Sequence, residues 1–272
     1  VRADGWLGNP YYQGNGPANT PFVRDGQVHA MTPDWNTMAA VTTGSDYIKN
    51  LHDRYLPQEP REDEDAYLGR IYRSVLSPFC LRLIENAAGL VLRRPIQIDG
   101  DDYWKDFSKN VDGLGSSINE YARRALVSSL TYGHSAVMVD YPTDPGILTL
   151  RDELQLGRRP YFINIDAPQI WGWRQASTLP SSKLTQVRLH EWVCIPEGDF
   201  GEKREEQIRV IYPGRYETWN TEGIVSSGTY SLDSIPLIPI YSNRVGMLTS
   251  KPPLVDIASL NITHYQRQAD LI

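Results

Sequence analysis

The side chains that most often do chemistry in proteins are scattered along this sequence. No two of the five histidines have the three- or four-residue spacing that holds a metal ion on one helix face: His29, His52, His134, His190 and His264. Cys80 and Cys194 lie far apart, which indicates neither a disulfide framework nor a metal knuckle and fits a reducing compartment. The Gly-x-Ser-x-Gly motif of a nucleophilic serine is absent. We therefore expect no enzyme activity and no metal or other cofactor.

Two short segments resemble ligand-binding loops but lack essential residues. Asp99-Gly100-Asp101-Asp102 starts like a calcium loop without that loop's later ligands, and a solvated turn is the better interpretation. Gly113-Leu114-Gly115-Ser116-Ser117 precedes a helix but has neither the lysine of a phosphate loop nor the third glycine of a dinucleotide loop. We interpret it as a connection into a capped helix.

Composition limits the classes of partner. The 272 residues carry a formal net charge of -6 and are 40% hydrophobic, which is ordinary for a globular chain. An acidic chain does not grip DNA by neutralising many phosphates, so any DNA partner is held loosely. The apolar runs are too short to cross a bilayer, and we expect no membrane partner.

Helical patterns dominate the N-terminal half. Residues 1–31 are rich in Gly, Pro and Asn and predict an extended arm that only partners order. Apolar spacing from Thr32 to Tyr55 predicts two short helices on either side of Gly44. A longer helix follows the acidic run at residues 62–65 and is bent or split at Pro78.

A second strong helix begins at Ser117, which forms a capping box with Glu120, and ends at Gly133. Its spacing predicts one buried face: Ile118, Tyr121, Ala122, Ala125, Leu126 and Leu130.

After Gly133 the pattern is that of strands, predicted at residues 135–141, 161–165, 186–195, 207–212, 216–220 and 237–241. Residues 212–215 predict a tight turn, and the charged residues 197–206 predict an exposed hairpin loop. The fold class is thus α+β, with a helical N-terminal half, a mainly antiparallel β middle and a C-terminal helix.

The last helix has Pro252 and Pro253 in its first turn and one apolar stripe: Leu254, Ile257, Ala258, Asn261, Ile262 and Tyr265. This stripe packs on its own chain or contacts another subunit, and the pattern favours neither use. Because the helix continues to Ile272 without a cap, we expect the natural protein to continue.

Two other groups are candidate subunit contacts. Trp171 and Trp173 stand in Trp171-Gly172-Trp173-Arg174, which predicts either a partner surface or an edge strand with one tryptophan inside. Arg93 and Arg94 end the long helix, where cations also simply favour the helix dipole.

Several segments together resemble a subfamily of tailed-bacteriophage portal proteins. The first are Tyr55-Leu56-Pro57 with Tyr67-Leu68-Gly69-Arg70, residues 85–95 (ENAAGLVLRRP) and residues 132–142 (YGHSAVMVDYP). Arg159-Pro160-Tyr161 and residues 170–174 (IWGWR) follow. The most specific is residues 251–265 (KPPLVDIASLNITHY). They occur in the family's order and span residues 32–272.

The resemblance implies a non-enzymatic ring of typically twelve subunits at one capsid vertex, in the host cytoplasm during assembly and afterwards in the virion. Residues 32–250 would form the α+β wing and residues 251–272 the start of the stem, whereas clip, remaining stem and crown are absent. Implied partners are the capsid protein, the terminase, the head–tail adaptor and double-stranded DNA passing without sequence-specific binding.

The alternative hypothesis is a β-rich virion module that recognises a host glycan or protein. It depends on exposed aromatic side chains, for which the candidates are Trp171, Trp173, Trp192 and Trp219.

Overall fold

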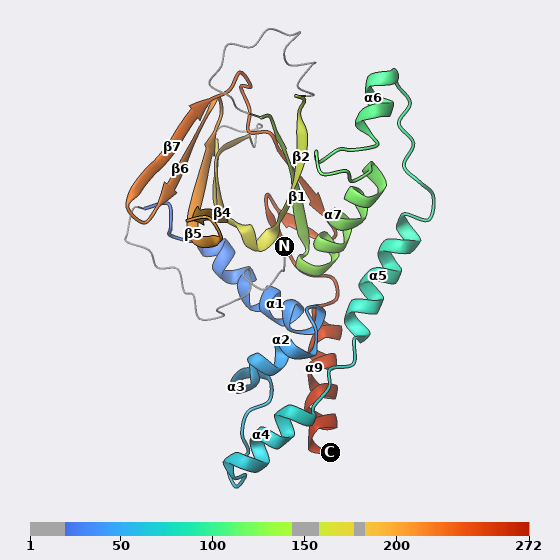
Figure 1. Cartoon of the computed structure of the whole chain (residues 1–272). Coiled ribbons are helices and arrows are strands. Elements are labelled where there is room, and N and C mark those ends of the chain that lie inside the picture. The colour runs from blue at the N-terminus through green and yellow to red at the C-terminus, as the bar shows by residue number, and fades with distance from the viewer. Residues whose placement is uncertain (1–19, 143–157, 177–182, 272) are drawn as a thin grey trace.

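A computed structural model describes residues 20–142, 158–176 and 183–271. The α+β class is confirmed, because helices fill the N-terminal half, antiparallel strands the middle and a helix the C-terminal end (Figure 1). The helices are α1 (Gly26–Thr42), α2 (Ser45–Asn50), α3 (His52–Tyr55), α4 (Glu64–Arg73), α5 (Phe79–Val91), α6 (Asp102–Phe107), α7 (Ile118–Tyr132), the short 3-10 helix η2 (Ala167–Gln169) and α9 (Val255–Asp270). The strands are β1 (His134–Asp140), β2 (Tyr161–Asp166), β3 (Ile170–Gln175), β4 (Leu184–Glu197), β5 (Gly201–Tyr212), β6 (Arg215–Asn220), β7 (Gly223–Thr229), β8 (Leu237–Tyr241), β9 (Arg244–Gly246) and β10 (Thr249–Ser250).

Helix α1 starts earlier than predicted. It begins at Gly26, so the extended-arm prediction is wrong for residues 26–31, while residues 1–19 of that arm lie outside the described residues. Val28, Met31 and Trp35 bury together in a small core, which stabilises the helical turns before Pro33. Helices do lie on both sides of Gly44, as predicted, although the second is divided into α2 and α3.

The other helix boundaries follow their sequence signals. The chain divides into α4 and α5 at the segment ending in Pro78, as predicted. The capping box of α7 is present, with Ser117 Oγ accepting from the Glu120 amide and Glu120 Oε2 accepting from the Ser117 amide at 2.8 Å. Gly133 ends α7 with a left-handed φ of 89°.

The predicted buried face of α7 is only partly right. Tyr121 and Ala125 are buried, whereas Ile118, Ala122, Leu126 and Leu130 are only half-buried. Three polar residues that apolar spacing does not mark are buried as well: Ser128, Ser129 and Thr131. The reason is that α7 has neighbours on two sides, with β1 and β2 on one and α1 and α5 on the other (Figure 1).

The strands form two main antiparallel sheets and a small hairpin. One sheet has the order β2-β1-β8, the second is the meander β3-β4-β5-β6-β7, and β9 pairs with β10. All six predicted strands are present. The prediction for residues 197–206 is wrong from Gly201 onward, because β4 and β5 remain paired as far as Glu197 and Gly201, which leaves a turn at residues 198–200.

The two largest clusters of buried side chains lie in different parts of the molecule. The first lies between the two main sheets and contains buried side chains of β1, β2, β3, β4, β5 and β8. The second joins α1, α2, α5 and α9 and is the helical end of the molecule (Figure 1). Among the described residues no helix is both long and apolar enough to cross a bilayer.

Gly133 is the glycine for which substitution is most informative. A Cβ there would lie 2.5 Å from Ser250 Oγ and 2.8 Å from the Lys251 carbonyl carbon, in a backbone conformation that side chains disfavour. We expect Gly133→Ala to lower the free energy of unfolding by more than about 1 kcal/mol, measured by urea denaturation. Gly89→Ala in α5 is the matched control, since its Cβ meets nothing within 4 Å and helix propensity predicts a gain of up to about 1 kcal/mol. Equal effects of the two changes would contradict this account.

Candidate subunit interface

Helix α9 is anchored by polar groups on its buried side. Tyr265 is fully buried and its hydroxyl lies 2.8 Å from Ser74 Oγ. Asn261 accepts a hydrogen bond from the Cys80 amide and donates one of 3.0 Å to the Ser77 carbonyl. The two hydrogen bonds of Asn261 satisfy backbone groups at the start of α5. They therefore fix the position of α5 against α9.

The predicted stripe of α9 is therefore a mixture of two faces. Tyr265 lies in the helical core, and the prediction that it contacts another subunit is wrong. Leu254 and Ile262 are half-buried against the same core, which favours packing within the same chain over contact with another subunit. Ile257 points away and is 36% exposed, so of the four predicted residues on this helix it alone is still a good contact candidate.

An exposed apolar face covers the adjoining sides of α5 and α9. The rings of Phe79 and His264 are 5.3 Å apart and join the two helices there. On α9 the exposed fraction of Leu260 is 69%, and on α5 that of Leu90 is 74%. We call this surface the α5–α9 apolar face, made of Phe79, Leu83, Leu90, Ile257, Leu260 and His264. Exposed apolar side chains that share one side of two adjoining helices are typical of a protein interface.

Most of this face was missed at the sequence level. The i, i+4, i+11 spacing of Phe79, Leu83 and Leu90 looks the same whether a neighbouring helix belongs to the same subunit or to another. The available signal was the width of the apolar pattern in α5, where a second row lies beside the buried row Cys80, Ile84 and Ala88.

The third face of α9 is polar. Asp256, Ser259, Thr263 and Asp270 are exposed and follow one side of the helix. Ser259 and Thr263 donate their hydroxyls to the helix backbone four residues earlier, which leaves a surface of short side chains. The helix thus has one side for the own core, one apolar side and one polar side.

The two arginines and two tryptophans differ in accessibility. Arg93 and Arg94 are exposed just after α5 and stay contact candidates.

Trp171 is 1% exposed and stacks on His190 at 4.2 Å, so its prediction as a subunit contact is wrong and the edge-strand interpretation holds. A register shift between Ile170 and Gly172 interrupts the alternation of side chains along β3, so Trp173 packs against the core between the main sheets whereas Trp171 packs with Ile208 and Val210.

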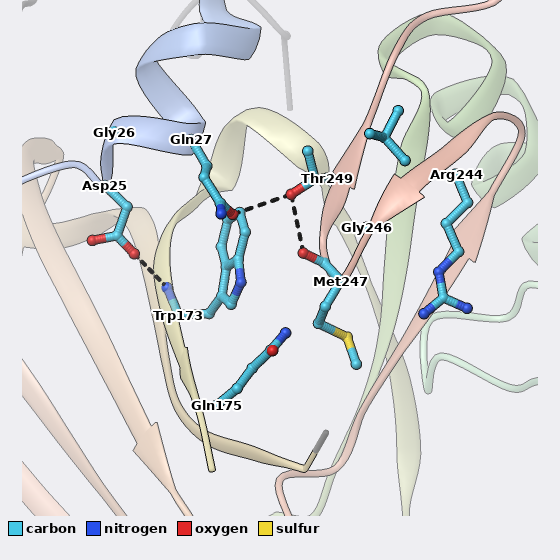
Figure 2. A pocket seen from close by; sticks show the side chains of 10 residues that line it. Asp25, Gly26, Gln27, Trp173, Gln175, Arg244, Gly246, Met247 and Thr249 are labelled. Carbon is cyan, nitrogen blue, oxygen red and sulfur yellow. Dashed lines mark hydrogen bonds between the residues drawn. The ribbon is translucent and has the colours of Figure 1, made fainter. Parts of the chain in front are cut away.

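Trp173 lines a cavity of about 930 Å³ between the start of α1, strand β3 and the β9–β10 hairpin. Figure 2 shows its indole on the same side of the cavity as Gln27 and Gln175, facing Met247 and, farther off, Arg244. The Thr249 hydroxyl lies 3.2 Å from Gln27 Oε1 and connects the hairpin to α1.

The described part of the chain holds no candidate metal centre. No three His, Cys, Asp or Glu side chains gather there in a group that could hold a metal ion. His134 and Ser250 come close, with Nδ1 and Oγ 2.6 Å apart, but both are buried and the ring's Nε2 has no hydrogen-bond partner. Burial lowers the pKa of His134 from 6.5 to about 4, so the ring is neutral near pH 7.

Comparison of the sequence with models of known protein families finds no match, and a search of curated proteins finds none either.

The pKa of His134 predicts an acid-sensitive junction between β1 and β10. Because the folded state disfavours the charged ring, stability is full above pH 6.5 and falls as the pH drops from 6.5 to about 4. The loss attributable to this group reaches about 3 kcal/mol at the acid end. Urea unfolding at several pH values should show a smaller acid loss in His134→Asn than in the wild type. The exposed His29→Asn is the control, and an unchanged slope in His134→Asn would contradict the assignment.

Proposed function

We propose that this chain is a structural ring subunit, the wing and upper stem of a tailed-bacteriophage portal protein. The observation that carries the proposal is the three-sided helix α9. A stem helix in a ring needs one side for its own subunit, one for the neighbouring subunit and one for the aqueous channel. The buried side, the apolar side and the polar side of α9 match these three needs.

The α5–α9 apolar face supports subunit assembly. Burying an exposed leucine or phenylalanine contributes roughly 1.5–3 kcal/mol, and this face has several such residues on two adjoining helices. In a ring, two different faces of each subunit meet, so this face would contact another part of the neighbouring copy.

The charge of the chain supports a role in which DNA passes without being held. The net charge is -6, and the polar side of α9 carries the small hydroxyl residues Ser259 and Thr263, together with Asp256, Arg267 and Asp270, of which Asp270 pairs with Arg70. A chain with net negative charge and no cluster of basic side chains on this helix neutralises few phosphates and therefore binds DNA weakly.

The segments that carry the family resemblance support the same assignment. Residues 251–265 span the junction into α9, and residues 132–142 span the end of α7 and strand β1. Under this proposal the partners are further copies of the chain, the capsid protein, the terminase and the head–tail adaptor. The place of action is the portal vertex of the virion, and no catalytic step is involved.

Glycan or host-protein recognition receives less support. That alternative required exposed tryptophans, but Trp171 is buried and Trp173, Trp192 and Trp219 are half-buried.

Electron microscopy and mass photometry of the purified full-length protein test the ring. We expect the wild type to form channelled rings, and Leu260→Asp to reduce assembly at least about tenfold because it places a carboxylate in the α5–α9 apolar face. Leu260 is 69% exposed, so the variant should keep the wild-type circular dichroism spectrum and melting temperature within a few degrees.

Ile238→Asp on β8 is the matched control, since Ile238 is 59% exposed but lies outside the α5–α9 apolar face. It should assemble like the wild type. A wild-type protein that stays monomeric at all concentrations would contradict the proposal.

A further inference from the structure

The β4–β5 hairpin extends beyond the sheet to which it belongs. Its two strands stay paired to Glu197 and Gly201, whereas β3 pairs with β4 only from Leu184 to Leu189 and β6 pairs with β5 only from Ile208 onward. Residues 194–204 are exposed throughout, so the end of the hairpin projects into solvent.

Phe200 at the hairpin turn is completely exposed, at 102% of its reference area. A phenylalanine in this position buries no surface in its own chain and gains nothing for the fold. The residues around it are acidic on balance, with Glu197, Asp199 and Glu202 nearest the turn and Lys203 and Arg204 following on β5. The tip is therefore an apolar knob with a negatively charged rim.

The cavity beside Trp173 has the complementary chemistry. Trp173 and Met247 supply apolar surface from facing walls, and the Arg244 guanidinium lies at the same cavity (Figure 2). At about 930 Å³ it has room for the three-residue turn of the hairpin, residues 198–200. An aromatic side chain entering it would meet an indole and a thioether, both favourable partners for a ring.

The start of α1 adds an anion-binding feature to the same cavity. Asp25 precedes the helix, but its carboxylate accepts from the Trp173 amide and pairs with Arg188 instead of capping α1. The first turn contains no acidic residue, and Gly26 and Gln27 line the cavity. The first amides of this 17-residue helix thus lack a side-chain acceptor and favour an incoming carboxylate.

We propose that the β4–β5 tip of one subunit inserts into the Trp173 cavity of a neighbouring copy. Phe200 packs between Trp173 and Met247, the Asp199 carboxylate caps α1, and the acidic rim faces Arg244. Within one subunit the hairpin does not fill the subunit's own cavity, because Phe200 is fully exposed. Knob and cavity are different parts of one chain, so the contact is heterologous and continues from subunit to subunit until a ring closes. The inference rests on the proposed function and names the contact that function requires.

Disulfide trapping between two differently labelled proteins tests the contact directly. In a Cys194→Ser background, which removes the exposed free cysteine, Phe200→Cys protein is mixed with Met247→Cys protein and oxidised. Cross-linked pairs should form in the mixture and not in either variant alone. Mixing Phe200→Cys with Ile238→Cys is the control for random collision and should stay uncross-linked.

Phe200→Asp measures how much the contact contributes to assembly. We expect association at least about tenfold weaker than in the wild type, with an unchanged melting temperature because the side chain contacts nothing in its own subunit. Phe200→Tyr keeps the ring and should assemble almost normally.

The outcomes separate this inference from the proposed function. Rings that form equally well with Phe200→Asp and give no specific cross-link overturn the tip-in-cavity contact and leave the ring subunit intact. Specific cross-links in a closed dimer support the contact and overturn the ring. Monomers without cross-links overturn both.

Discussion

Three consecutive residues, Tyr132, Gly133 and His134, hold the layers of this fold together. The Trp35 indole of α1 donates to the Tyr132 carbonyl at 2.9 Å, and the amide and hydroxyl of Ser242 both donate to the Gly133 carbonyl. His134 reaches Ser250 just before α9. Because these groups are buried, each lost bond would leave an unsatisfied polar atom, and the helical and β parts cannot shift independently.

The surfaces of α9 follow from that junction. Ser250 and Lys251 pack so closely on Gly133 that the chain enters α9 in one direction only. Tyr265 and Asn261 then turn inward and bind the segment from Ser74 to Cys80, which sets α5 beside α9. The apolar face of these two helices is thus a consequence of buried polar contacts and not of apolar spacing alone.

The same logic connects the cavity with the rest of the fold. The Asp25 carboxylate accepts a hydrogen bond from the Trp173 amide at the edge of β3 and pairs with the Arg188 guanidinium, so it does not cap α1. One acidic side chain therefore protects a sheet edge that could otherwise pair with another chain, and leaves a helix start open to an acceptor from outside. Under the proposed function this places a recognition site where two layers of the wing meet.

Local signals in the sequence were sufficient for the fold class and for most element boundaries. The capping box at Ser117 and Glu120, the left-handed Gly133 and the break at Pro78 act within a few residues, so they determine the structure wherever the chain lies in space. Strand alternation likewise marked all six predicted strands, because one face of each meets a core. The β4–β5 hairpin is longer than the sequence predicted, because part of the charged segment predicted as a loop is paired as strand. Charged residues also form strands when a short turn brings the partner strand alongside.

Which residues face a neighbour was decided only by the tertiary structure. Tyr265 and Ile257 belong to the same apolar stripe in the sequence, yet one is buried and the other exposed, because α5 covers a single side of α9. Trp171 and Trp173 are two residues apart, and the register shift between Ile170 and Gly172 sends them to different neighbours: Trp171 stacks on His190 in the core, and Trp173 lines the cavity beside the β9–β10 hairpin. A periodic sequence pattern identifies which side chains are apolar, but it does not identify what packs against them. What covers them depends on contacts between residues that are about a hundred positions apart, as Trp35 and Tyr132 or Gly133 and Ser250 are in this protein.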